Sequence, residues 1–210
     1  MIKVERISVM NLENAVRGAR NPMNSWAKMD SYYDEKGTYV LGQNDLDLCR
    51  RLACAGPDHR KFLRQIFVSM DITAPLYWWK EFDTYKVATV ANSCSTMHKI
   101  HTKPFAREDF SHDRLDEGGL AALDAVIAYL EAERQKFVAN KEDRQPWHNL
   151  IQMLPSSFNQ MRTVTLNYEN LMNIYYARRT HKLAEWHVLC DWITSLPYAR
   201  ELICVKEEKQ

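Results

Sequence analysis

The sequence predicts a mixed α/β (α+β) fold: a single domain covering residues 1–210, with a small central sheet flanked by helices. Runs in which apolar residues alternate predict strands, and runs in which they recur three and four positions apart predict helices. Both kinds of run occur along the whole chain, which is typical of mixed folds. No internal repeat, low-complexity tract or Gly/Ser-rich linker separates them, which favours one domain.

The chain opens with one predicted strand and two predicted helices. Apolar residues alternate from Ile2 to Val9, and Asn11 is placed to cap a short helix behind that strand. Asn44 is placed to cap a second helix, which ends at Gly56-Pro57. The inward face of the second helix is expected to consist of Leu46, Leu48, Leu52 and Ala53.

A strand and an aromatic helix follow. From Ile66 to Thr73 every second residue is apolar and falls on one face. Pro75 suits the start of a helix from Leu76 to Phe82. This helix carries Tyr77-Trp78-Trp79, which could stack on a flat ring. Neighbouring helical positions diverge by about 100 degrees, so core packing is favoured for two of the three.

The middle of the chain is predicted to contain two loops and two helices. Residues 84–97 are small and polar, which predicts a loop, and residues 99–119 are predicted to form a surface excursion. From Leu120 to Val138 the apolar residues follow helical spacing, with charges on the opposite side. A shorter helix is expected from Trp147 to Met153, ended by Leu154-Pro155.

The last part of the chain is predicted to contain one strand and two helices. Met161 to Leu166 alternates as a strand does. Helices are expected from Tyr168 to Arg178 and from Leu183 to Leu196, and Pro197 closes the second one.

Composition excludes several classes of partner. The 28 basic residues against 27 acidic ones leave a net charge of +1, so no overall field attracts nucleic acid or an anionic membrane. Every apolar run is far shorter than the roughly 20 residues that cross a bilayer. The five cysteines form no CxxC pair, and the N-terminus lacks a signal peptide's apolar segment. These features predict a cytoplasmic protein without a nucleic-acid or membrane partner.

Few residues indicate a metal or a phosphate loop. No glycine-rich phosphate loop is present. His98, His101 and His112 come nearest to a metal cluster, but solvated loop histidines are the favoured interpretation, so no metal is predicted. His59 lies at a turn, where it could be a base, a donor or a structural residue.

Two other places could carry chemistry. Cys94 lies in a polar stretch and could be a nucleophile, or a small residue where space is short; Asn92 beside it could bind a planar ligand or belong to a turn. Arg178 and Arg179 end a helix, where their charges suit either a phosphate or the helix dipole.

In the order of these segments, the chain resembles the flavin-dependent thymidylate synthases. That family has a turn Gly-His-x-Ser/Thr-Pro-Phe-Glu-His, a strand, then Ala-Pro opening a helix. A loop follows that begins Arg-His-Arg and continues through Ser and Asn to Ser-x-Arg-Tyr. Here the turn matches residues 58–65, Ala74-Pro75 opens the helix, and the loop matches residues 84–97 without a gap.

The resemblance returns near the C-terminus. Leu154-Pro155, the stretch from Val164 to Asn173, and Arg178 follow the family's order. Ala184-Glu-Trp-His-Val stands for the family's Ala-Gln-x-Glu-Ile, and one extra residue falls between Asn173 and Ala184.

The resemblance implies reductive methylation of dUMP to dTMP. In that family FAD binds between the subunits of a tetramer, methylene-tetrahydrofolate supplies the carbon, and reduced flavin supplies the hydride. No enzyme cysteine attacks the pyrimidine there, so positioning and electrostatics carry the catalysis. The expected partners are therefore a nucleotide and further copies of this chain in a homo-oligomer, a tetramer, and neither nucleic acid nor membrane.

The resemblance also assigns residues to sites. Contacts with FAD are implied for His59, Lys61, Thr84, Tyr85, Lys86, Asn167 and Asn173. Contacts with the nucleotide are implied for Asn92, Cys94, Thr96, Arg178 and Arg179. Arg178 and Cys94 are the candidate catalytic residues.

The family's basic signature is altered in this chain. Thr84-Tyr85-Lys86 replaces Arg-His-Arg, and Thr96 replaces the arginine that follows. Arg178, or Arg179 if the extra residue falls earlier, is what remains of the arginines that hold phosphate. The candidate replacement cations are Lys61, Arg64 and Lys86. The alternative hypothesis is an inactive or repurposed oligomeric homologue that binds a nucleotide or a flavin.

Overall fold

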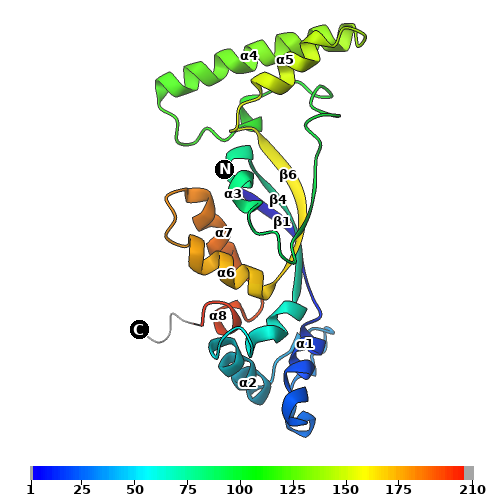
Figure 1. The fold of residues 1–210 in the computed structure, drawn as a ribbon, viewed down its shortest axis with the longest axis vertical. Coiled ribbons are helices and arrows are strands. Elements are labelled where there is room, and N and C mark those ends of the chain that lie inside the picture. Colours follow the sequence, from blue (N-terminus) through cyan, green and yellow to red (C-terminus); the bar gives the residue numbers. More distant parts are fainter. Residues whose placement is uncertain (1, 206–210) are drawn as a thin grey trace. The chain divides into compact units, whose positions relative to one another are not determined.

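The computed structural model describes residues 2–205 and confirms a fold of mixed helices and strands (Figure 1). The strands are β1 Lys3–Met10, β2 Tyr32–Tyr33, β3 Tyr39–Val40, β4 Phe67–Pro75, β5 Val90–Ser93 and β6 Asn159–Asn167. The α-helices are α1 Leu12–Ala19, α2 Gln43–Cys54, α3 Leu76–Phe82, α4 Glu117–Ala139, α5 Gln145–Met153, α6 Tyr168–Arg178, α7 Ala184–Thr194 and α8 Ala199–Leu202. Short 3-10 helices are η1 Asn21–Met23, η2 Trp26–Lys28, η3 Arg60–Gln65 and η4 Arg107–Asp109.

The main sheet has four strands in the order β1-β4-β6-β5. Along β4 the predicted alternation is confirmed, because Val68, Met70 and Ile72 are all buried. A separate antiparallel pair, β2 and β3, aligns Tyr33 with Tyr39.

Two compact units form within the described residues, and each collects distant parts of the sequence. The first unit comprises residues 2–3, 72–84 and 91–163, and the second comprises residues 4–71, 85–90 and 164–205. Strands β1, β4, β5 and β6 contribute to both units. That residues 1–210 form one domain stays a prediction, and residues 1 and 206–210 lie outside the described part.

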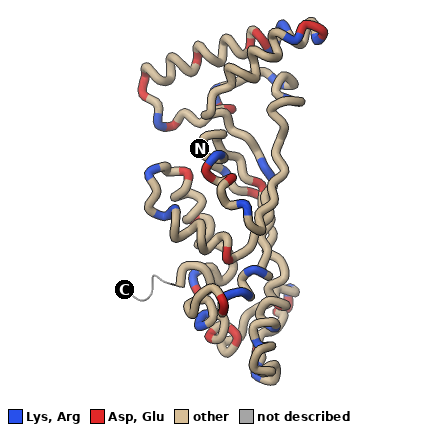
Figure 2. The backbone as a smooth tube through the Cα atoms, in the orientation of Figure 1, with Lys and Arg blue, Asp and Glu red and all other residues tan. Residues whose placement is uncertain are grey.

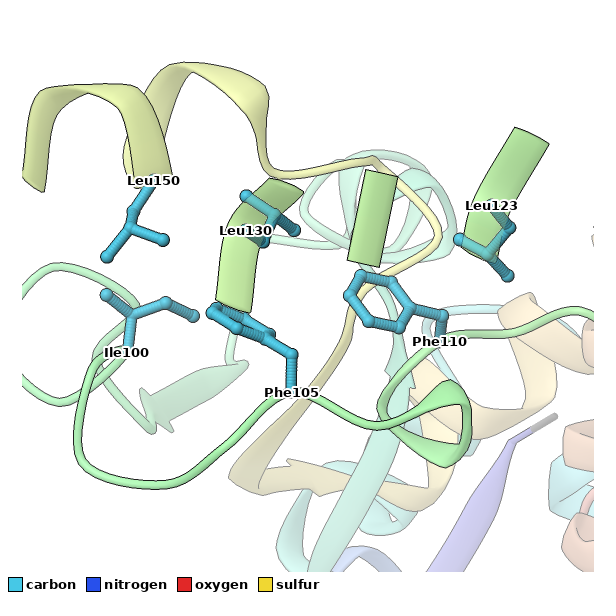
Figure 3. Close-up of a cluster of buried hydrophobic side chains, with 6 residues drawn as sticks. All are labelled: Ile100, Phe105, Phe110, Leu123, Leu130 and Leu150. Carbon is cyan, nitrogen blue, oxygen red and sulfur yellow. The ribbon is translucent and has the colours of Figure 1, made fainter. Parts of the chain in front are cut away.

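The core of the first unit includes the segment that we expected at the surface. Ile100, Phe105 and Phe110 are buried against residues of α4 and α5, of which Figure 3 labels Leu123, Leu130 and Leu150. The prediction of a surface excursion over residues 99–119 is therefore wrong at these apolar positions. They are spaced too irregularly to form a helix or strand pattern, yet each side chain anchors the segment beneath the helices.

The aromatic helix α3 packs its tryptophans into the core, as predicted for two of its three adjacent aromatic residues. Trp78 and Trp79 are fully buried, while Tyr77 is half-buried. The two indole rings meet edge to face with centroids 4.9 Å apart. Phe82 stacks on Trp78, so the helix contributes an aromatic cluster to the first unit.

Helix α2 forms where predicted, but its cap and its inward face differ from the expectation. Gly42 holds the N-cap position, and the Asp30 carboxylate accepts hydrogen bonds from the backbone N–H groups of Asn44 and Asp45. The buried positions of the helix are Asp45, Cys49 and Ala53, while the expected leucines at 46, 48 and 52 are half-buried. A carboxylate distant in sequence therefore caps α2, which the local pattern could not reveal.

The buried acid of α2 is matched by a buried arginine. Arg20 Nε lies 2.5 Å from the Asp45 carboxylate, which also accepts from the N–H groups of Asp30 and Ser31 and from the Ser31 hydroxyl. Burial alone would raise the pKa of Asp45, but the hydrogen bonds from Ser31 and Arg20 outweigh it, so the pKa is lowered. This ion pair links the C-terminal end of α1, where Arg20 is the C-cap residue, to α2.

Two further local expectations are corrected. Asn11 takes the N-cap position of α1 in a left-handed conformation, but its side chain donates to the Gln65 carbonyl and does not cap the helix. Within the predicted loop over residues 84–97, Val90–Ser93 forms strand β5 at the edge of the sheet. Its exposed residues lack apolar alternation, so pairing with the neighbouring strand defines it.

The remaining helices confirm their predictions. Helix α6 has the predicted bounds Tyr168–Arg178, and α4, α5 and α7 agree to within a few residues, whereas the short helix α8 was not predicted. Figure 2 shows basic and acidic residues interspersed along the described chain, in keeping with the small net charge. Among residues 2–205, no helix is both long and apolar enough to cross a bilayer.

Candidate functional site

The second unit brings together two of the predicted site residues, Tyr85 and Arg178. Arg178 is the last residue of α6, and its Nε donates a hydrogen bond of 2.8 Å to the Tyr85 hydroxyl. Its guanidinium carbon lies 4.6 Å from the ring centroid of Trp186, a buried residue of α7. A ring face and a hydroxyl therefore fix the direction of this cation, and such fixed guanidinium groups bind phosphate or carboxylate well.

Three more predicted residues lie near the same helix. Lys86 follows Tyr85 and is exposed, and Asn173 is exposed on α6. Arg179 is also exposed, with its guanidinium carbon 5.4 Å from the ring centroid of Tyr176. The second unit thus presents polar and cationic side chains along and beyond the last turns of α6, a composition that can bind an anion.

Asn167, which the resemblance assigns to FAD, caps α6. Its side-chain oxygen accepts a 3.0 Å hydrogen bond from the backbone N–H of Asn170, and the residue is buried. The Asn170 amide in turn donates to the Val87 carbonyl at 2.6 Å and to the Thr89 hydroxyl at 2.9 Å. Asn167 therefore supports the segment that carries Tyr85 and Lys86.

Arg64, a candidate replacement for a missing phosphate cation, forms an ion pair in the structure. Both Arg64 and Arg60, from η3, donate to the carboxylate of Glu169 on α6, with Arg60 Nε at 3.1 Å. Burial alone would raise the pKa of Glu169, yet the hydrogen bonds from Arg64 and Arg60 outweigh it and lower the pKa. No local pattern in the sequence predicts this contact, because more than 100 positions separate the partners.

His59 and Lys61 line a cavity of about 780 Å³ in the second unit. Leu48, Leu52 and Phe62 supply apolar wall, and Asp58 adds a carboxylate to the lining. This volume falls within the range of about 300–1,000 Å³ that is typical of ligand sites. Both residues were predicted to contact a cofactor, and the structure places them at one cavity.

Residues of the first unit line a second cavity, of about 340 Å³. Cys94 and Thr96, two of the predicted nucleotide contacts, belong to its lining, as do Lys99 and Gln160. Asn92 lies on β5 and is exposed, outside that lining. Thr84 is also exposed in this unit, and its hydroxyl donates to the Glu81 carbonyl at the end of α3, a local structural bond.

A hydrogen-bonded frame holds Cys94 at this cavity. Its backbone N–H donates to the Met161 carbonyl at 2.9 Å, and its carbonyl accepts from the Gln160 amide at 2.7 Å. The buried Gln160 is itself held by Arg162 and by the indole N–H of Trp79. Within residues 2–205 no hydrogen bond joins the Cys94 thiol to a histidine or a carboxylate, so its role as a nucleophile stays a prediction.

The histidines noted in the sequence have other surroundings. His112 Nδ1 lies 2.8 Å from the Phe110 carbonyl, and the His101 ring meets Phe137 edge to face. In the described part of the chain, no three His, Cys, Asp or Glu residues gather as a metal site requires.

No protein-family model matches this sequence, and no curated protein matches it significantly. Solved structures do share its fold. A thymidylate synthase X from Helicobacter pylori, solved with FAD and dUMP, has a TM-score of 0.69 at 17% identity, over 98% of this chain and 100% of that one. A second structure of the enzyme from that organism, also with FAD and dUMP, gives 0.66 at 16% identity, over 95% and 98% of the two chains.

A UMP/dUMP methylase from Streptomyces cacaoi, bound to 5-bromo-UMP, has a TM-score of 0.64 at 14% identity. The match covers 99% of this chain and 92% of that one. These likenesses run through nearly the whole chain, but at such low identity they concern the fold alone. The chain therefore has the fold of flavin-dependent thymidylate synthases.

Proposed function

We propose that this protein binds FAD and a uracil nucleotide and methylates the nucleotide reductively, converting dUMP to dTMP with methylene-tetrahydrofolate as carbon donor. The observation that carries the proposal is the fold, which matches enzymes solved with FAD and dUMP over nearly the whole chain. The proposal includes a cytoplasmic homotetramer, whose assembly light scattering would measure.

The residues of the second unit fit an anionic cofactor in part. Lys86, Asn173 and Arg179 are exposed polar or cationic groups, as phosphate binding needs, whereas the Asn167 side-chain oxygen is used to cap α6. Bound FAD would supply the hydride chemistry. Arg178, oriented by Tyr85, would bind and orient an anionic group of the nucleotide.

A second candidate function is a homologue that binds flavin or nucleotide without methyl transfer. It is favoured by the pairing of Arg64 with Glu169, which engages one candidate cation in a bond within the protein, and by the uncharged Thr84 and Thr96. A charge-assisted hydrogen bond contributes about 1.5–3 kcal/mol, so the loss of two phosphate arginines could lower affinity by several powers of ten.

The absorption spectrum of the purified protein between about 350 and 500 nm tests flavin binding, because oxidised flavin absorbs there. A colourless protein that takes up no FAD on titration contradicts both the cofactor and the methylation. If FAD binds, formation of dTMP from dUMP with reduced flavin and methylene-tetrahydrofolate separates the two functions. Arg178→Gln should then weaken nucleotide binding at least about tenfold. Arg200→Gln, an exposed arginine on α8 of the same unit, is the matched control.

A further inference from the structure

The cavity of the first unit contains a cation that the family resemblance does not assign. Lys99 belongs to the lining and its side chain is exposed. Within residues 2–205 it pairs with no carboxylate, whereas the other lysine of the lining, Lys103, pairs with Asp109. Lys99 is thus the lining cation whose charge no acidic side chain neutralises.

Hydrogen bonds fix the backbone that carries this lysine. The Ser95 hydroxyl oxygen accepts from the N–H groups of Met97 at 3.2 Å and His98 at 3.0 Å, which closes a turn ahead of Lys99. Behind it, Thr102 donates both its backbone N–H and its hydroxyl to the Lys99 carbonyl, at 3.1 and 2.8 Å. The backbone that carries the Lys99 side chain is therefore fixed by hydrogen bonds.

The rest of the lining combines donors with an apolar wall. Thr73, Thr96 and Asn159 add two hydroxyls and an amide. Ile100, Phe105 and Phe158 supply apolar and aromatic surface. One cation with neutral donors suits a phosphate monoester, and aromatic surface suits a flat ring.

The charges around the cavity are consistent with an anion near Lys99. His101, two positions along the chain, has a pKa lowered first by burial and then by the positive charges of Lys141, Lys99 and Arg134. Glu108 is an exposed carboxylate of the lining, but it forms no ion pair with Lys99. Of the two lysines and two acids in the lining, Lys103 and Asp109 pair with each other, so the lysine charge left for an anion is that of Lys99.

We propose that Lys99 is the phosphate-binding cation of a nucleoside monophosphate pocket in the first unit. In the family signature an arginine stands at the position of Thr96. In this chain Lys99, three positions later, would supply the positive charge. The base would lie against the aromatic wall, and Thr96 would donate its hydroxyl to a phosphate oxygen. This inference rests on the proposed function, because it specifies how the uracil nucleotide is recognised.

Calorimetric titration of the full-length protein with UMP, dUMP, uridine and inorganic phosphate tests the assignment. Lys99→Gln should raise the Kd for UMP and dUMP at least about tenfold, while uridine binding changes less than about twofold. Lys80→Gln removes an exposed lysine of α3 that lines neither cavity, so it should leave every affinity unchanged. Weak phosphate binding that Lys99→Gln abolishes would agree with the assignment.

Lysine acetylation followed by mass spectrometry gives a second readout without a variant. Bound dUMP should protect Lys99 from acetylation and leave Lys80 unprotected. Equal nucleotide affinity of the two variants, with no protection of Lys99, overturns the inference while the proposed function stands. A wild-type protein that binds neither nucleotide nor FAD overturns the proposed function and this inference with it.

Discussion

The burial of the ion-pair cluster of Arg60, Arg64 and Glu169 allows us to predict how much the cluster stabilises the fold. The side chains of Arg60 and Glu169 are only 13% and 12% exposed, so this pair is largely shielded from water. Arg64 is 54% exposed, so water screens its interaction with Glu169 and its share of the stability is small. Breaking a buried pair by removing one partner typically costs about 3–5 kcal/mol, because a buried charge is left unmatched. We expect Glu169→Gln to lower the free energy of unfolding by about 2–4 kcal/mol.

Urea unfolding at pH 7 measures this loss, which should lower the midpoint by roughly 1–2 M. Glu35→Gln, which removes an exposed carboxylate of the same unit, is the matched control and should change the stability by less than about 0.5 kcal/mol. If the two variants unfold at the same urea concentration, the cluster does not stabilise the fold and the reasoning is refuted.

The pH dependence provides an independent check on Glu169. Its pKa in the folded protein is lowered below the ordinary value of 4.5, so the carboxylate contributes stability above that value. This contribution is lost as the pH falls through the lowered pKa, when the group becomes protonated in the folded state. The stability difference between wild type and Glu169→Gln should therefore be constant from pH 6 to 8 and shrink below about pH 4.5. A difference that grows in acid would contradict this assignment.

Two further predictions concern the helix cap and the cysteines. Asn167→Ala removes the side chain that caps α6 and should cost about 1–2 kcal/mol in thermal or urea unfolding; an unchanged midpoint would mean that the cap contributes nothing. At pH 8 a thiol reagent should label the exposed Cys94 first, because burial raises the pKa of Cys49 and of Cys190 to about 12. Mass spectrometry of the modified peptides measures the labelling rate of each cysteine. Equal rates for Cys94, Cys49 and Cys190 would contradict the burial of Cys49 and Cys190.

The sequence predicted those elements whose patterns are local. Helix α6 was predicted with its observed bounds, and β4 follows from strict alternation, whereas the capping role of Asn167 was not predicted. Strand β5 could not be predicted, because its four residues carry no apolar pattern and only the pairing with neighbouring backbone defines it. The cap of α2 was missed for a similar reason, since Asp30 lies outside the helix.

The site was predictable only in part. Contact between Tyr85 and Arg178 agrees with the order of the family motifs, although no spacing rule could give their hydrogen bond. Arg64 was an open candidate for phosphate binding, and Glu169 was missed as its partner because charge pairing across more than 100 residues depends on the fold. Lys99 was not among the predicted site residues. Nothing in the sequence distinguishes it from other surface lysines, and only the fold shows that it lines a cavity.

The ion pair between Arg64 and Glu169 also bears on where phosphate can bind. A cation held by a carboxylate must give up that pair before it can serve a ligand, so replacement of a family arginine by another basic residue does not by itself restore a phosphate site. Arg178 has different surroundings, which include the Tyr85 hydroxyl and the ring of Trp186. Lys99 differs too, since no acid pairs with it in the described residues. If nucleotide affinity depends on Lys99 but survives Arg64→Gln, the phosphate-binding charge lies at a different position from the family's arginines. Dependence on Arg64 would show that the ligand can break its ion pair.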